Sequence, residues 1–192
     1  MLKKIHYNSP VILTFAFLSL FALVLGGLTD GWTTRNLFRV YRASLSDPLT
    51  YFRMVFHVIG HSGYEHYMGN MLLLLVIGPG IEEKYGSRLL LLVMFATALV
   101  AGLIQFIFFP GTALLGASGI VYMLIILASL SGIKQGSIPL TLLLVAAFYI
   151  GGEVIKGIFV KDNISQSTHV IGGIVGGIFG FYVSNIKSQK RT

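Results

Sequence analysis

The stretch Gly116-Ala117-Ser118-Gly119 places one hydroxyl among small residues, inside an uncharged tract that runs from Leu89 to Ile133. Tracts of this kind are typical of membrane-spanning helices, and small residues in such helices let two backbones approach closely. Ser118 is therefore either packing material or a nucleophile. Its spacing differs from the soluble hydrolase signature G-x-S-x-G, because Gly119 follows the serine directly. Read alone, the stretch favours packing.

The composition indicates a polytopic membrane protein. The chain has 192 residues, of which 55% are hydrophobic and 11% are charged, whereas soluble domains carry about 25% charged residues. Its formal charge of +7 is attributed to topology and headgroup contact. Basic residues do not alternate with aromatics as in a base-stacking surface, so no nucleic-acid partner is expected. The chain has no Cys, which excludes disulfide and thiolate chemistry.

We expect one domain over residues 1–192, an all-α compact bundle of six transmembrane helices. The expected spans are residues 10–27, 64–81, 89–109, 115–130, 138–150 and 167–186. The fourth and fifth are short of the roughly 20 residues that cross a bilayer, so they are tilted, buried or incompletely spanning. A signal peptide would also place an apolar stretch first, but Gly26-Gly27-Leu28 is a poor cleavage site, so we keep it as a helix.

The connection from residue 28 to residue 63 is long and mixes arginines with aromatics. Arg35, Arg39 and Arg42 recur at helical spacing, which predicts short amphipathic helices at headgroup level. Six spans put both termini on one side, where eight basic residues stand against six on the other. Both short tails are basic, so both termini are expected in the cytoplasm. The sequence carries no signal for an oligomeric state.

His66 and Asn70 share one helix face, because they are four residues apart. Each can bond a neighbouring helix, or the two can form a donor pair for a developing oxyanion. Spacing alone favours the first reading. His57 and His61 precede them, but the zinc signature H-E-x-x-H lacks its second His after Glu65-His66. No metal or other cofactor is expected.

His169 stands at the head of a ridge of small residues, with Gly172, Gly176 and Gly180 at helical spacing after it. Such a ridge brings two helix axes close together. If its partner is the fourth span, His169 can reach Ser118 and act as its base. A lone His at a span end is otherwise an ordinary interface residue. Tyr122 follows Ser118 by one turn, and either supports the His169 ring or belongs to the core.

In this order, these residues resemble the rhomboid family of intramembrane serine proteases. The resemblance covers about residues 52–180, and Phe52 stands where the family often has Trp. The matching positions are Phe52-Arg53, His57, His61, His66, Asn70, Glu82, Gly86, Gly116-Ala117-Ser118-Gly119, Tyr122, His169-Val170-Ile171-Gly172 and Gly176.

The resemblance implies a serine endopeptidase that cuts single-span membrane proteins in or near their transmembrane segments. It implies that Ser118 is the nucleophile, that His169 is the general base, and that His66 and Asn70 form the oxyanion hole. We therefore expect a multi-pass protein with the six-span fold, embedded in the lipid bilayer of a bacterial inner membrane. Two other functions remain open from the residues. A non-enzymatic binder of spanning helices would need neither Ser118 nor His169, and a small channel would show internal repeats.

Overall fold

The computed structural model describes residues 6–131 and, beyond them, residues 140, 143, 144, 147, 174, 175, 177 and 178. The expected spans at 138–150 and 167–186, and with them His169, lie almost entirely outside these residues. The elements are α1 (Pro10–Leu28), α2 (Trp32–Asn36), β1 (Val40–Tyr41), α3 (Pro48–Phe56), the 3-10 helix η1 (His57–Ile59), α4 (Tyr64–Tyr85), α5 (Ser87–Phe108), β2 (Ala113–Leu114) and α6 (Ser118–Ser131).

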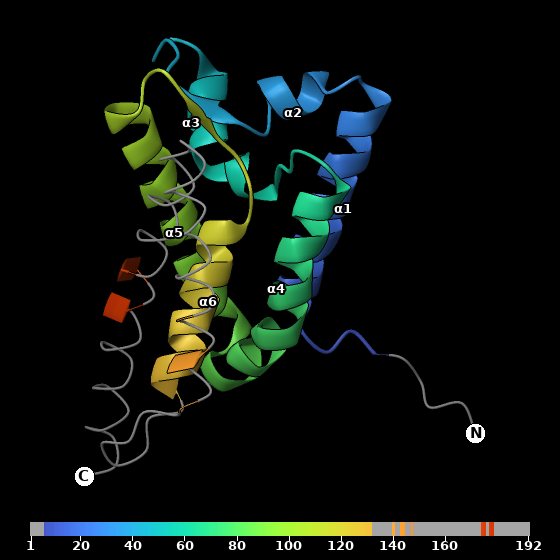
Figure 1. Cartoon of the computed structure of the whole chain (residues 1–192), viewed down its shortest axis with the longest axis vertical. Coiled ribbons are helices and arrows are strands. Elements are labelled where there is room, and N and C mark those ends of the chain that lie inside the picture. Colours follow the sequence, from blue (N-terminus) through green and yellow to red (C-terminus); the bar gives the residue numbers. More distant parts are fainter. Residues whose placement is uncertain are drawn as a thin grey trace.

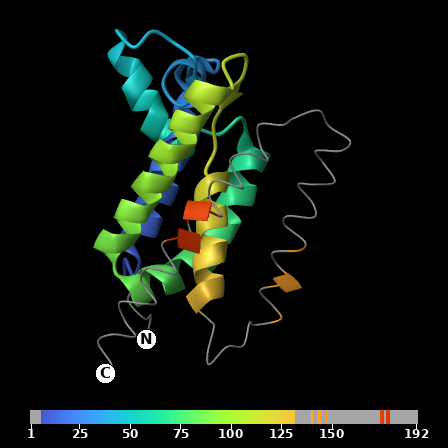
Figure 2. The ribbon, with the colours of Figure 1, turned by 90° about the vertical axis from the view of Figure 1, so that its left-hand side faces the viewer.

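Four long helices lie side by side, and the short elements gather at one end of them (Figure 1). α1 and α5 run toward that end, while α4 and α6 run away from it. The same layering is visible after a quarter turn (Figure 2). We call the end with α2, α3 and the strands the loop end, and the opposite end, where α1 begins, the N-terminal end.

The core forms around α4, which packs against both α1 and α6. Ile12, Leu74, Ile120 and Leu124 are fully buried there. α4 and α1 approach closely at Gly78, where a Cβ atom would lie 2.5 Å from the Ile12 side chain. Large apolar side chains such as those of Phe17, Phe21, Leu72, Val76, Leu91 and Phe95 point outward. An apolar exterior on an apolar core is what a bilayer requires of a helical bundle.

Two of the described helices, α1 and α5, are long and apolar enough to cross a membrane. α4 has 22 residues but carries charged residues at both ends, and α6 has 14 residues. The first four expected spans each coincide with a helix, with ends that differ by up to four residues. The largest difference is at α4, because the helix continues beyond the expected end at residue 81, through charged residues, to Tyr85.

α4 and α5 are joined by the single residue Gly86. A buried carboxylate holds this junction: Glu82 accepts hydrogen bonds from the backbone N–H groups of Val11 and Ile12, both at 3.0 Å. The Ser87 hydroxyl donates a third bond to it at 2.7 Å. A carboxylate is favourable at helix N-termini, where backbone N–H groups lack partners within the helix. Glu82 thus fastens the beginnings of α1 and α5 to the end of α4.

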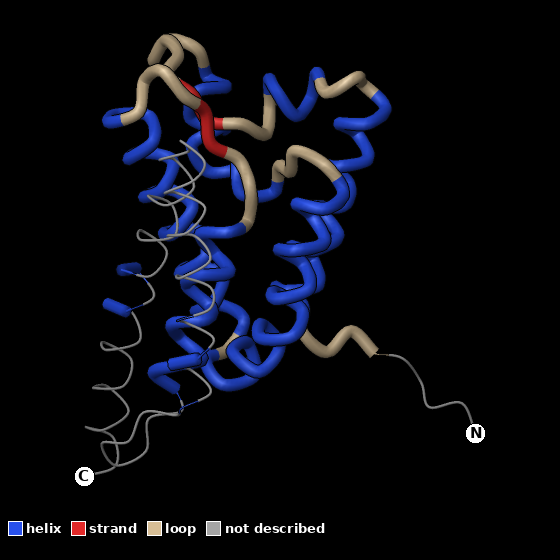
Figure 3. The backbone as a smooth tube through the Cα atoms, in the orientation of Figure 1, coloured by secondary structure: helices blue, strands red, loops and turns tan. Residues whose placement is uncertain are grey.

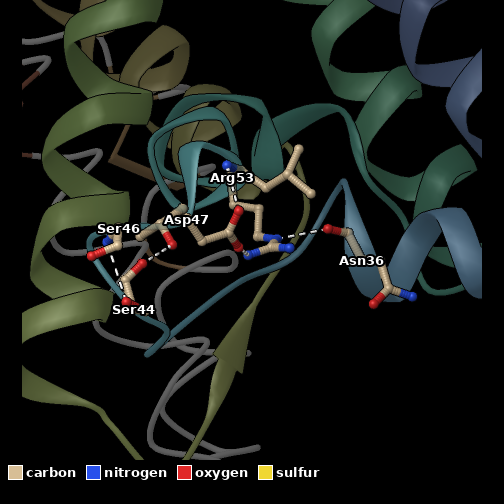
Figure 4. A network of polar contacts seen from close by, with 7 residues as sticks. Asn36, Ser44, Ser46, Asp47 and Arg53 are labelled. Carbon is tan, nitrogen blue, oxygen red and sulfur yellow. Dashed lines mark hydrogen bonds and ion pairs between the residues drawn. The ribbon is translucent and has the colours of Figure 1, made fainter.

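A second polar network holds the connection between α1 and α4 in place. The Arg53 Nε donates to the Asn36 carbonyl at 2.6 Å, and its guanidinium pairs with Asp47 at 3.0 Å (Figure 4). Asp47 also caps α3 by accepting from the Leu49 N–H at 3.0 Å. Arg53 is buried, so this network takes the place of water around its charge. The loop between α2 and α3 is therefore fixed from inside.

β1 and β2 pair as a two-stranded antiparallel ladder, with Val40 opposite Leu114 and Tyr41 opposite Ala113 (Figure 3). The all-α expectation missed this ladder, since four residues are too few for a recognisable strand pattern. The arginine spacing was also misleading. Only Arg35 is helical, whereas Arg39 precedes β1 and Arg42 follows it. Arg42 instead donates to the Phe106 carbonyl at 3.2 Å, near the end of α5.

Candidate active site

Ser118 is the first residue of α6. It is half-buried, and it follows a loop whose backbone is held on both sides. β2 pairs with β1 before the loop, and the Gly116 N–H donates to the His57 carbonyl at 3.0 Å. The first N–H groups of a helix have no partner within it, and they carry the positive end of the helix dipole. The start of α6 is therefore suited to a developing negative charge.

His66 and Asn70 lie in the first two turns of α4 and face this loop. Gly116 has a φ of +120°, a conformation that side-chain-bearing residues rarely adopt. A Cβ atom on Gly116 would lie 2.7 Å from the His66 Nε2 and 3.9 Å from the Asn70 Nδ2. The glycine thus lets both nitrogen atoms approach the backbone two residues before Ser118. Of the sequence-predicted site residues, the structure brings His66 and Asn70 beside the serine loop.

The hydrogen bonds of His66 determine which ring nitrogen carries its proton. The Ser62 N–H is 3.4 Å from the His66 Nδ1, and the Ser62 hydroxyl is 3.1 Å from the same atom. A backbone N–H can only donate, so Nδ1 is the acceptor and the neutral ring carries its hydrogen on Nε2. That N–H faces the Gly116 loop. Asn70 donates one amide hydrogen to the His66 carbonyl at 3.1 Å, and its second remains for another acceptor.

His57 and His61 hold the residues around His66 and Gly116 in place through hydrogen bonds and ring contacts. The His57 Nε2 donates to the Ala98 carbonyl of α5 at 3.1 Å, while its own carbonyl holds Gly116. The His61 Nδ1 donates to the Ile59 carbonyl at 3.2 Å. Its ring meets the edges of the His66 and Tyr67 rings, with centroids 5.0 and 5.5 Å away. Both histidines tie η1 and the following loop to the site.

Burial keeps both supporting rings neutral. It lowers the pKa of His57 from 6.5 to about 4, against a smaller opposing effect of the Ala98 carbonyl. Burial also lowers the pKa of His61 to about 4, and the nearby His66 acts in the same direction. No group of three or more His, Asp or Glu side chains in the described part of the chain is placed to hold a metal ion.

A cavity of about 640 Å³ adjoins the site. Its walls come from the end of α1, from α2, and from the loop that leads into α4, and Leu115 closes it beside the serine loop. Asp30, Arg35 and Arg39 add charged groups to a lining that is mostly apolar. Water in this cavity can therefore come close to the candidate site, whose other neighbours are apolar helices.

The sequence alone did not reveal the roles of Ser62, Gly116 and His57. Ser62 stands one turn before His66, a signal that could have identified it as the residue that fixes the ring. Tyr122 is buried one turn after Ser118 on α6. The predicted approach of His169 to Ser118, and its packing on Tyr122, involve a residue outside the described part of the chain.

Residues 48–186 match the rhomboid domain family. The chain belongs to the rhomboid family. It is 30% identical over 159 residues to rhomboid-related protein 2 of Mus musculus, covering 72% of this chain and 53% of that protein. It is 26% identical over 185 residues to rhomboid protease GluP of Bacillus subtilis, covering 91% of this chain and 35% of that protein.

This rhomboid is also 28% identical over 149 residues to rhomboid protease GlpG of Pectobacterium atrosepticum, covering 74% of this chain and 52% of that protein. It spans about half the length, or less, of these relatives. Rhomboids are integral membrane proteins, which agrees with the two apolar helices α1 and α5. The family match extends over the fifth and sixth expected spans and His169, and it confirms the resemblance found in the sequence.

Proposed function

We propose that this rhomboid is an intramembrane serine endopeptidase. It hydrolyses peptide bonds in or near the transmembrane segments of membrane proteins, with single-span proteins as its substrates. Ser118 is the nucleophile, His169 is the general base, and His66 and Asn70 form the oxyanion hole. Two of the relatives are named as rhomboid proteases, which supports a peptidase over a binder of spanning helices.

The observation that carries the proposal is the approach of two side-chain donors to the loop before Ser118. The His66 Nε2 and the Asn70 Nδ2 lie 2.7 and 3.9 Å from the position of a Gly116 Cβ atom. A pair of preorganised donors at a helix N-terminus stabilises an oxyanion more than it stabilises a neutral carbonyl. Helix–helix packing alone would not require the Nε2 proton to be fixed by Ser62.

The chemistry follows from these positions. His169 removes the Ser118 hydroxyl proton as the Oγ attacks the scissile carbonyl carbon, and the carbonyl oxygen becomes an anion. The donors of His66, Asn70 and the Ser118 backbone N–H bind that anion. The imidazolium of His169 then protonates the leaving amine, and a water molecule hydrolyses the acyl-enzyme by the same steps. His169 must be neutral to begin, so activity falls on acidification.

The membrane setting is part of the proposal. The chain is one domain of six spans, with spans five and six at 138–150 and 167–186. Both termini lie in the cytoplasm, and the protein resides in a bacterial inner membrane. In this topology the loop end faces the opposite side, which puts the cavity beside the site and the starts of α4 and α6 near that water surface. Tyr122 packs against the His169 ring and holds its orientation.

The test is cleavage of a model single-span substrate by the purified full chain in detergent. Ser118→Ala and His169→Ala are expected to abolish cleavage, and a fluorophosphonate probe is expected to label the parent protein at Ser118. Ser129→Ala is the matched control, because Ser129 lies on the same helix and bonds only within it, to the Ile125 carbonyl at 2.6 Å. Cleavage that survives Ser118→Ala would sink the proposal.

A further inference from the structure

A second cavity, of about 490 Å³, lies between α1 and α5. We call it the α1–α5 groove. Its sides are Val11, Phe15 and Leu18 of α1 and Leu91, Met94 and Phe95 of α5. Pro10 and Ser87 stand at its N-terminal end, and residues of α3 and η1 lie across its other end. Nearly all of this lining is apolar, and it contains no group that the proposed hydrolysis uses.

The dimensions of the groove select its occupant. From Ser87 to Ala98 it extends along α5 for about 16 Å, at about 1.5 Å of rise per residue. That length is about half of the ~30 Å hydrocarbon core of a bilayer, and so about one leaflet. The bond from the His57 Nε2 to the Ala98 carbonyl holds η1 at the far end, which stops an occupant from continuing to the other leaflet.

The length of the groove favours an acyl chain over a spanning helix. A helix that crosses the bilayer needs a path of about 30 Å, whereas residues of α3 and η1 close the groove after about 16 Å. A polymethylene chain of one leaflet's length fits that path and matches the apolar lining.

The charged residues at the N-terminal end of the groove indicate the charge of the lipid headgroup. Arg88 is exposed in the first turn of α5, directly after Ser87. Lys84 lies in the last turn of α4, with its ammonium 5.7 Å from the Tyr85 ring. Glu83 is exposed beside them, while the Glu82 charge is taken up by its three donors. Among the described residues at this end, two basic side chains stand against one exposed carboxylate. This favours an anionic headgroup, since each basic residue near a lipid surface contributes about 1 kcal/mol of attraction to anionic lipid.

We propose that the α1–α5 groove is a binding site for an anionic glycerophospholipid of the leaflet at the N-terminal end. One acyl chain lies in the groove, and the phosphate lies beside Arg88. The floor of the groove includes Val58 of η1 and Ile120 of α6. These residues are neighbours of His57 and Ser118 in the chain, so the bound chain supports the walls of the candidate site without taking part in the reaction.

The first experiment fills the groove. Leu91→Trp puts a large ring into it, and Leu92→Trp is the matched control, because Leu92 is exposed to the same degree (57% against 56%) but does not line the groove. Native mass spectrometry of the full chain, after detergent exchange with phosphatidylglycerol, counts the lipids that stay bound. We expect the parent and Leu92→Trp to retain one phospholipid, and Leu91→Trp to lose it.

The second experiment tests the headgroup. Arg88→Gln is expected to reduce the preference for phosphatidylglycerol over phosphatidylcholine by about fivefold, the effect of about one basic residue. Glu83→Gln should keep or raise that preference. Equal retention by Leu91→Trp and the parent would overturn the site, and an unchanged preference in Arg88→Gln would overturn the anionic headgroup. Binding is measured without substrate, so a failed protease assay leaves both results interpretable.

Discussion

At the N-terminal end of the bundle, the buried Glu82 carboxylate accepts three hydrogen bonds, whereas at the loop end several buried polar atoms have no partner. The Arg39 Nε, the His57 Nδ1 and the His61 Nε2 are three of the four unpartnered buried side-chain polar atoms in the described part of the chain. Each unpaired buried group costs about 1–3 kcal/mol. The hydrogen bonds at the N-terminal end therefore stabilise the fold. At the loop end, around the candidate site, buried polar atoms remain able to form further hydrogen bonds.

This difference between the two ends predicts that substitutions at one end and at the other will have different effects. At the loop end, the unpartnered polar groups lie around the candidate site, and strained or unpaired groups are common at functional sites. At the N-terminal end, the same kinds of groups serve only to fasten helices. We expect substitutions at the loop end to change turnover more than stability, and those at the N-terminal end to do the reverse.

The largest expected effect is on turnover. His66→Ala removes one proposed oxyanion donor and should lower kcat by about 10²–10³-fold, the usual cost in serine proteases. His66 is half-buried, so the unfolding midpoint in detergent should move little. Asn70→Ala should lower kcat to a similar degree. A turnover loss of less than tenfold in both variants would mean that this helix face serves packing.

Acidification should destabilise the loop end. The pKa of His57 is about 4 in the folded chain and 6.5 when the chain is unfolded, so the unfolded state binds more protons between these values. Stability is therefore complete above pH 6.5 and falls as the pH drops to about 4. The loss for His57 is at most about 3 kcal/mol, at 1.36 kcal/mol per pKa unit. His61 adds a loss in the same window.

Denaturant titrations between pH 7.5 and 4.5 measure this dependence. His57→Gln cannot gain a charge, but it keeps an amide donor for the Ala98 carbonyl. Its stability should depend less steeply on pH than that of the parent. Identical slopes would show that His57 is not the group that titrates.

At the N-terminal end, Glu82→Gln should lower the free energy of unfolding by about 2 kcal/mol. The amide has no charge and keeps one acceptor oxygen. With that oxygen in the Oε1 position, Val11 and Ser87 donate to a neutral acceptor and the Ile12 N–H loses its acceptor. Turnover per folded molecule should stay near the parental value. Glu83→Gln is the control, because Glu83 is exposed next to it. Equal effects of both variants would remove the contrast between the two ends.

Among the substitutions expected to lower the free energy of unfolding, Gly116→Ala should have a smaller effect than Glu82→Gln. Its φ of +120° disfavours a side chain by about 1–2 kcal/mol, and the new methyl group would meet the His66 Nε2 at 2.7 Å. Turnover should therefore fall although no donor is removed. Gly111→Ala is the comparison, since a Cβ atom there meets open space. A fully active Gly116→Ala variant would show that the loop adapts without displacing His66.

The long apolar helices were the part of this fold that the sequence could predict. α1 matched its expected span to one residue, because its apolar run begins at a proline and ends at Gly27-Leu28. The pairing of His66 with Asn70 was also predictable, since their spacing of four requires a shared face. The Gly116 contact was not, because it depends on a β ladder between residues 74 positions apart (Val40 and Leu114). Glu82 looked like a surface residue because its partners are backbone atoms of another helix.

The one-residue link at Gly86 has a consequence for biogenesis. α4 contains His66, Asn70, Glu82 and Glu83, which are costly in lipid when the helix is alone. α5, joined to it directly, is one of the two described helices that are long and apolar enough to cross a membrane. With no loop between them, the two helices should enter the bilayer together as a hairpin, with α5 supplying the favourable transfer energy. The polar helix that carries half of the site is thus delivered by its apolar neighbour.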